Sequence, residues 1–277
     1  LNQLQSNLQD QIDKFGRHVF KDGDRVLDGY TTYDGSIRSI PIEFTGASSP
    51  TDLTAAQLGA LKGKEIQLSG TANVKAKVLG AEAITGAYYR LYVKYIGTDT
   101  LFDDGDTIEL STGEDSVSLN GTDISAGDTL GICRETASGE DVGYYGGVFQ
   151  DSGIFFVKGH FVFTDNTEAF YVKGSETSKL TGNAVFDITE SIITSGDDTS
   201  LLDNATGQPN LTAPGADRYK ISLNLKFIPS TDTTVVEGQQ RITLLDVKED
   251  IVTQSVRTQY SELGKTLAQR TEDESGS

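Results

Sequence analysis

Several residue types are absent or rare in this 277-residue chain, which has no Met, no Trp, one Cys and two His. A single cysteine cannot form an internal disulfide. Cys133 stands between Ile132 and Arg134, a setting that predicts a small buried hydrophobic residue rather than a catalytic thiol. Because a natural reading frame begins with Met, we expect the sequence to be trimmed, processed or internal to a longer polypeptide.

Long apolar runs and positive charge are also scarce. No stretch of about 18 apolar residues occurs, and no charged-then-apolar leader opens the chain, so we expect neither a membrane span nor a signal peptide. The 23 Lys and Arg residues stand against 41 Asp and Glu, which gives a net charge of -18. Phosphate binding needs clustered Lys and Arg. The composition therefore predicts no nucleic-acid partner and no membrane insertion, and favours a solvated acidic surface.

Familiar catalytic and ligand-binding motifs are missing as well. The sequence contains no HExxH, GxSxG, CxxC or GxxxxGK[ST] motif, which removes the usual zinc, hydrolase, redox and nucleotide signatures. His18 and His160 stand far apart in apolar, strand-like contexts and are predicted to be structural. The acidic turns at 103–106 and 196–198 lack the twelve-residue spacing of a calcium loop with its distal Glu. We therefore predict no catalytic residue, no metal and no cofactor.

Two segments show helical periodicity, one at each end of the chain. Residues 1–17 place five apolar side chains on one face at spacings of three and four, namely Leu1, Leu4, Leu8, Ile12 and Phe15. Residues 251–277 are predicted to form a second helix and a linker, with apolar positions at Ile251, Val252, Val256, Tyr260, Leu263 and Leu267. Stripes this sparse do not hold an isolated helix in water. Each helix needs a partner, either its own domain or another chain in a short coiled coil.

Strand signals dominate between these helices. Glycine-centred turns recur at short intervals over residues 62–143 and predict a small inserted β-barrel or sandwich. Residues 18–61 and 144–250 are expected to form the main β-rich domain around this insert. In the segment 218–229 the alternation predicts a strand whose inward side chains are Tyr219, Ile221, Leu223, Leu225 and Phe227. The predicted fold is mainly β, with β-sandwich or barrel lobes, an inserted small β-domain and amphipathic helices at both termini.

A turn-rich loop precedes that last strand. Residues 204–217 contain two prolines and two glycines. Prolines restrict the unfolded ensemble of a loop, and the apolar Leu211 and Ala213 need a surface to cover. Leu211 is therefore a candidate contact residue, and the alternative is an ordinary surface loop packed on its own domain.

Four segments resemble, in this order, large virion structural proteins of tailed phages: QDQIDKFGRHVFKDGDRVLDG, GIFFVKGHFV, LLDNATGQPNLTAPGADRYKI and LGKTLAQRTEDESGS. The likeness is to baseplate-associated or proximal tail-fibre proteins, especially those of contractile-tailed phages of cyanobacteria. APGADRYK is the most specific motif, and the closing DESG is the next. The family usually carries an aromatic residue before the Asp of this close, where the present chain has Glu272. Residues 62–143 share only a general β pattern with the family.

The resemblance implies a non-enzymatic homotrimer that connects baseplate and tail fibre. Such a protein is made in the host cytoplasm, is found in the virion, and has other tail and baseplate proteins as partners. The candidate assembly contacts are Leu1, Leu4, Leu8, Ile12, Phe15, Leu211, Val256, Tyr260, Leu263 and Leu267. Two alternatives stay open. A glycan-binding β-rich surface adhesin or receptor-binding module would show exposed aromatic platforms, and a polysaccharide-degrading enzyme would show two close carboxylates in a cleft, one with a raised pKa.

Overall fold

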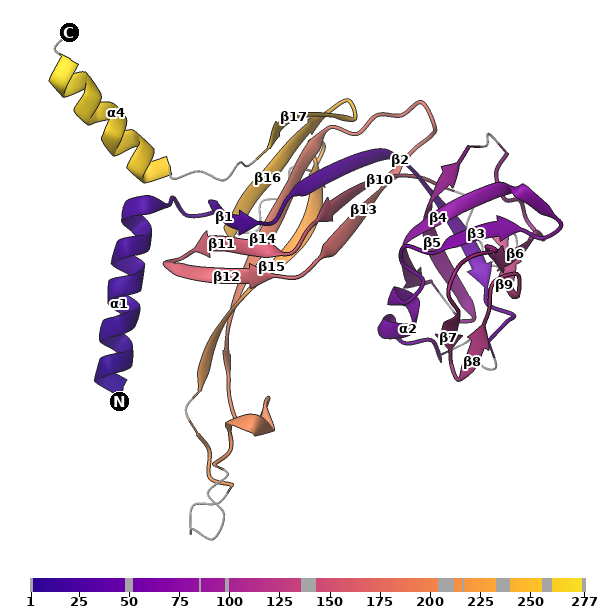
Figure 1. Ribbon diagram of the computed structural model, residues 1–277, viewed down its shortest axis with the longest axis horizontal. Helices are drawn as coiled ribbons and strands as arrows, with labels where there is room; N and C mark the ends of the chain where they lie inside the picture. Colours follow the sequence, from indigo (N-terminus) through magenta and orange to yellow (C-terminus); the bar gives the residue numbers. More distant parts are fainter. Residues whose placement is uncertain are drawn as a thin grey trace. The chain divides into compact units, whose positions relative to one another are not determined.

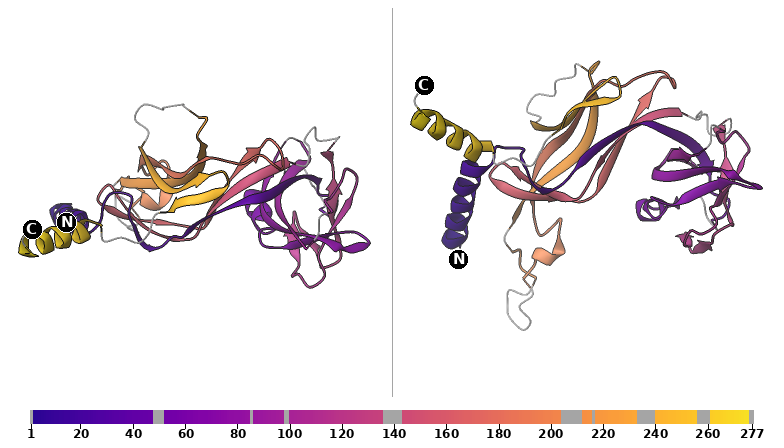
Figure 2. Two further views of the ribbon diagram at one scale, coloured as in Figure 1. Left: turned by 90° about the horizontal axis from the view of Figure 1, so that it is seen from above. Right: turned by 45° about the horizontal axis from the view of Figure 1, so that its top comes forward.

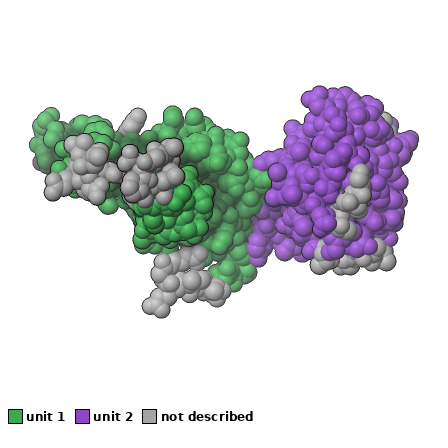
Figure 3. All heavy atoms as spheres, turned by 90° about the horizontal axis from the view of Figure 1, so that it is seen from below, with its two compact units in different colours: residues 1–32, 148–169, 181–277 green, residues 33–147, 170–180 purple. Residues whose placement is uncertain are grey.

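A computed structural model of the chain describes residues 2–47, 52–84, 86–97, 100–135, 143–203, 212–215, 217–232, 240–255 and 261–275. The chain folds into two compact units, which Figure 3 colours separately. Unit 1 comprises residues 1–32, 148–169 and 181–277, and unit 2 comprises residues 33–147 and 170–180. Strands dominate both units, and helices lie near both ends of the chain, which confirms the predicted fold class (Figure 1).

Unit 1 contains two antiparallel sheets. One has the strand order β1-β11-β12, with bounds Arg25–Asp28, Gly153–Val157 and His160–Thr164. The other has the order β15-β14-β16-β17, with bounds Arg218–Pro229, Gly182–Ile193, Gln240–Lys248 and Ile251–Ser255. A shared core joins the sheets: Phe155 of β11 meets Phe186 of β14 edge to face, with ring centroids 5.2 Å apart. This contact between sheets makes unit 1 a small β-sandwich.

The longest pairing in unit 1 is between β14 and β15, from Gly182 opposite Pro229 to Ile193 opposite Arg218. Three of the predicted inward residues of β15, namely Ile221, Leu223 and Leu225, pack against the sandwich core, and Phe227 is buried. Tyr219 is 51% exposed, so its predicted inward position is wrong. The β14–β15 ribbon continues past the two-sheet core, as Figure 1 shows. At the start of β15 the Tyr219 ring lies 5.7 Å, centroid to centroid, from the His160 ring at the start of β12, which covers it only in part.

Unit 2 is built on an eight-stranded sheet of order β13-β10-β2-β5-β4-β3-β6-β9. In that order its strands span Thr167–Lys173, Gly143–Gln150, Thr31–Glu43, Tyr88–Ile96, Thr71–Ala83, Glu65–Leu68, Thr107–Leu110 and Thr129–Cys133. Strand β9 also pairs with β2, with Ile42 opposite Cys133, so the six strands from β2 to β9 close into a barrel. The short helix α2 (Ala55–Gly59) and the hairpin of β7 (Val117–Leu119) and β8 (Thr122–Ile124) add Leu58, Val117 and Leu119 to the barrel core.

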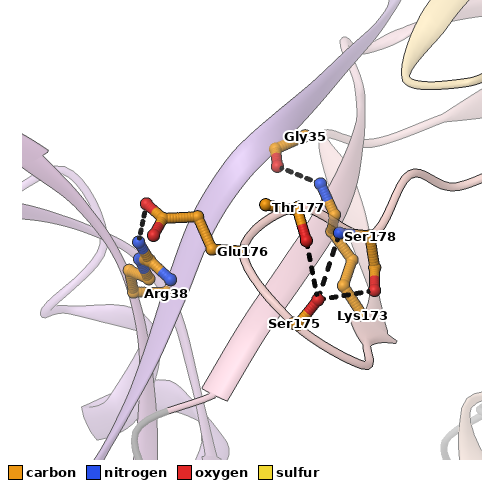
Figure 4. A network of polar contacts seen from close by, with 7 residues as sticks. All are labelled: Gly35, Arg38, Lys173, Ser175, Glu176, Thr177 and Ser178. Carbon is orange, nitrogen blue, oxygen red and sulfur yellow. Dashed lines mark hydrogen bonds and ion pairs between the residues drawn. The ribbon is translucent and has the colours of Figure 1, made fainter.

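Polar contacts connect β2 to the end of β13 and to the segment that follows it (Figure 4). The Lys173 ammonium donates a hydrogen bond of 2.9 Å to the Gly35 carbonyl, and Arg38 pairs with Glu176 at 2.8 Å. The Arg38 guanidinium also lies 3.5 Å from the centroid of the Tyr144 ring, on β10. Lys173 is only 7% exposed, so its contact with the carbonyl compensates part of the cost of burying an ammonium group.

Two predicted boundaries differ from the structure. The insert was expected at 62–143, whereas unit 2 begins at residue 33, because Ile40, Ile42 and Phe44 belong to the barrel core and β2 pairs with both β5 and β9. The C-terminal helix was expected from 251, whereas Ile251–Ser255 is strand β17, paired with β16. Helix α4 spans Ser261–Ser275 and helix α1 spans Asn2–Val19.

Candidate assembly surface

Helix α1 docks on unit 1 through small and polar side chains. The face that meets the sandwich carries Gln9, Asp13, Gly16 and, just past the helix, Phe20. A β-carbon on Gly16 would overlap the ring of Phe156, so glycine permits the close approach of helix and strand. Near the other end of this contact, the side-chain amide of Gln9 lies 2.9 Å from His160 Nδ1.

The final residues of this contact are aromatic. Phe20 is buried, and its ring lies 5.8 Å, centroid to centroid, from both Phe156 and Phe161. Such aromatic pairs contribute about 0.5–1.5 kcal/mol beyond the area that they bury. The end of α1 is therefore anchored on the β11–β12 hairpin, whereas Leu8 and Phe15 of the predicted apolar face are more than half exposed.

The apolar stripe of α1 faces solvent. Leu8 is 57% exposed, Ile12 36% and Phe15 65%. Successive helical residues are rotated by about 100°, so the stripe and the docked face lie roughly a quarter of a turn or slightly more apart on the helix. These three residues lie on one face of the helix, as their spacing in the sequence predicted. Leu1, and the side chain of Leu4, lie outside the described residues.

Helix α4 also carries two exposed apolar side chains. Leu263 and Leu267, one helical turn apart, are 43% and 54% exposed. Helix α4 contacts α1, and its first turn lies beside the end of α1 in both views of Figure 2 as well as in Figure 1. Of the remaining predicted contacts, Val256, Tyr260 and Leu211 lie outside the described residues.

The stems of the turn-rich loop are ordered. Leu202 forms a β-bridge with Pro214, and the Gly215 N–H donates to the Leu201 carbonyl at 2.9 Å. Leu201, in the short 3-10 helix η2 (Thr199–Leu201), is buried. The described parts of the loop are thus fastened to one another at its base.

An open groove of about 1350 Å³ runs between α1, β12 and the start of β15. Its apolar lining comes from β12, the end of β14 and β15: Phe161, Val162, Phe163, Ile193, Tyr219 and Ile221. Phe163 is 62% exposed and Tyr219 51%. The polar face of α1, through Gln9, Asp10 and Asp13, forms one wall. Sequence periodicity missed this groove, because its walls come from segments about 150 residues apart.

Charged groups of both signs surround the groove. Lys158 forms an ion pair with Glu190, which also accepts a hydrogen bond from the Tyr219 hydroxyl. Hydrogen bonds from Thr194 lower the pKa of Asp197, and hydrogen bonds from Ser200 lower that of Asp198. Both shifts favour the carboxylate, whereas a general acid working near neutral pH needs a raised pKa.

The other candidates for chemistry are placed as follows. Cys133 is buried in the barrel, and burial raises the pKa of its thiol to about 12, which disfavours the reactive thiolate. Among the described residues, no three His, Cys, Asp or Glu side chains gather in a way that would hold a metal ion. In the same part of the chain, no helix combines the length and the apolar content that crossing a bilayer requires.

Comparison with known proteins gives one partial match. Residues 150–277, slightly less than half of the chain, match a family model described as a domain of unknown function, DUF4815. The matched stretch includes β11, β12, the four-stranded sheet and α4, and it leaves out α1 and the strands of the closed barrel. No curated protein and no solved structure matches the chain.

Proposed function

We propose that this protein is a non-enzymatic structural component of a phage tail, which connects baseplate and tail fibre as a homotrimer. The observation that carries the proposal is that α1 packs on its own domain through Gln9 and Gly16 and leaves Leu8, Ile12 and Phe15 exposed to solvent. Exposed apolar stripes on a helix are typical of surfaces that another chain covers. The resemblance to tail proteins supports the same role, with the virion as its location and other tail proteins as its partners.

Energetics indicate how large the assembly contact must be. Burying a large apolar side chain completely contributes about 1.5–3 kcal/mol, so the three partly exposed residues of the α1 stripe contribute roughly 3–4 kcal/mol together. Association costs an estimated 4–15 kcal/mol in lost translational and rotational freedom. The stripe therefore needs further contact area, and Leu263 and Leu267 of α4 are exposed apolar groups that can supply some of it.

Sedimentation velocity on the purified chain tests the assembly. We expect the mass of a trimer, and we expect the double substitution Leu8→Asp with Ile12→Asp to give a folded monomer, because each buried unpaired charge costs several kcal/mol. Val172→Asp is the matched control, since Val172 is 55% exposed and lies in unit 2. A wild-type monomer at high concentration would contradict the proposal.

Location in the virion needs a separate measurement. Gold-labelled antibodies raised against unit 2 should decorate tailed particles at the junction of baseplate and fibre. Decoration of capsids alone, or of no particle at all, would contradict the proposed location in the tail. It would not bear on the proposed homotrimer.

A second candidate function rests on the two exposed aromatic rings of the groove. Phe163 and Tyr219 line the groove together with polar groups such as Gln9 and His160, a composition suited to a sugar ring in a glycan-binding module. A glycan array tests this candidate. Binding that Phe163→Ala abolishes would support it, and an array without any signal would contradict it.

A further inference from the structure

The groove and the stripe are two uncovered apolar surfaces of unit 1: α1 carries the stripe on one face, and its polar face forms one wall of the groove. We propose that the groove of one copy receives the α1 stripe of a second copy, an inference that rests on the proposed homo-oligomer. The contact is head to tail: each chain offers its stripe to one neighbour and its groove to the other.

The stripe has the spacing of a groove-binding helix. Leu8, Ile12 and Phe15 stand at positions i, i+4 and i+7, which are the anchor positions of an amphipathic helix in an apolar groove. A coiled-coil seam between helices would use the same three residues, with Leu8 and Phe15 at position d and Ile12 at position a. Such a seam would leave the groove uncovered, whereas insertion of the stripe into the groove covers both apolar surfaces.

The groove presents an apolar surface to which the apolar stripe is suited. The two rings of Phe163 and Tyr219 are more than half exposed, with Ile193 and Ile221 beside them. At about 1350 Å³ the groove has room for the three anchor side chains and part of the helix backbone. The chain's own α1 cannot place its stripe there, because its Gln9 and Asp13 already form the wall.

Charge at the contact itself does not oppose a second copy as the occupant, because Lys158, Arg218 and Lys220 line the groove beside its Asp residues and the stripe is uncharged. With a net charge of -18, two copies of the chain repel each other wherever their acidic surfaces meet. The stripe avoids this repulsion, since Asn7 and Gln11 flank it. The charged residues of α1 lie toward the opposite side of the helix and are paired along it, Lys14 with Asp10 and Arg17 with Asp13, each at 2.7 Å.

A head-to-tail contact either closes into a ring or grows into a filament. The homotrimer proposed above corresponds to a ring of three, in which every stripe and every groove is filled. A helix-to-helix contact would instead bring the stripes of the copies together and leave every groove empty.

Complementation between two broken copies tests the contact. The stripe variant carries Leu8→Asp and Ile12→Asp and keeps its groove, and the groove variant carries Phe163→Asp and keeps its stripe. We expect each variant alone to sediment as a folded monomer. An equimolar mixture should form a dimer and nothing larger, because one intact stripe meets one intact groove and the other two surfaces are blocked.

Each other outcome has a distinct meaning. If the groove variant alone assembles like the wild type, the groove is not the receptor and the inference is overturned, while the proposed oligomer stands. If the stripe variant also assembles like the wild type, the α1 stripe plays no part in assembly. The exposed stripe then no longer supports the proposed function. Circular dichroism and melting curves of both monomers, compared with Val172→Asp, show that neither variant is unfolded.

Discussion

At the scale of single residues, one buried carboxylate connects three strands of the four-stranded sheet. The Asp187 side chain on β14 is 4% exposed and lies 2.6 Å from Lys226 Nζ on β15 and 2.8 Å from Arg241 Nε on β16. Burial by itself would raise the pKa of Asp187, but the hydrogen bonds from Lys226 and Arg241 outweigh it and hold the pKa below its usual value. The ionised form of Asp187 is therefore tied to the folded state.

This carboxylate gives a prediction on pH. Because its pKa is lower in the folded chain than the unfolded value of about 3.9, its contribution to the free energy of unfolding is present above pH 4 and is lost as the pH falls through the folded pKa. Asp187→Asn should cost about 2 kcal/mol at pH 7. Urea unfolding from pH 7 to pH 2.5 should show the difference between the two proteins shrinking toward low pH. A difference that stays constant across this pH range would mean that Asp187→Asn acts through packing rather than through the charge of the carboxylate.

At the scale of elements, three hairpins close through two-residue turns with positive φ at both positions. They are Lys158-Gly159, Asn120-Gly121 and Glu249-Asp250, and the last pair has φ values of 51° and 64°. Type I′ turns of this kind favour Asn-Gly, because side chains other than Asn and Asp are strained at positive φ. The turn at 249–250 folds β17 back on β16, which is why the predicted helix from Ile251 is a strand.

Exchanging turn residues tests this explanation. Glu249→Asn with Asp250→Gly should raise the free energy of unfolding by about 1 kcal/mol, since the strain at Glu249 is removed and glycine takes the second positive-φ position. The reciprocal change in the β7–β8 hairpin, Asn120→Glu with Gly121→Asp, should lower it by a similar or larger amount. Both are measured by denaturant unfolding. If the first change is destabilising, the backbone of that turn is not of the I′ type.

At the scale of the whole molecule, the chain passes between its two units four times. Three of the passages occur inside β2, β10 and β13, which are neighbours in one sheet, and the fourth follows Leu180. Each unit is thus built from separate segments of the sequence, and strands that run from one unit into the other connect them. The match to the domain of unknown function ignores this division, since it includes residues 170–180 of unit 2 together with most of unit 1.

The net charge of -18 predicts how assembly responds to salt. If an uncharged stripe enters an apolar groove, the acidic surfaces of the copies still repel each other, and salt screens this repulsion. Self-association should therefore strengthen as NaCl rises from 20 mM to 300 mM, because the Debye length falls roughly threefold or more over this range. Sedimentation equilibrium measures the change. Weaker association at higher salt would instead identify ion pairs as the main attraction between copies.

The sequence alone determined what depends on neighbouring residues. Period-two alternation located β15, helical spacing put Leu8, Ile12 and Phe15 on one face, and composition set the large negative charge. These features follow from local backbone geometry. The likeness to tail proteins stays a proposal, because nothing in the fold by itself names a function.

Only the tertiary structure decided what covers each face. Periodicity says that Leu8 and Phe15 share a face, yet it cannot say that Gly16, on another face, is the one that meets Phe156. In the same way, closure of the barrel by β2 and β9, and the groove between α1 and β15, join residues about 90 to 210 positions apart. Such contacts depend on the summed packing of the whole chain, and no short window of sequence contains them.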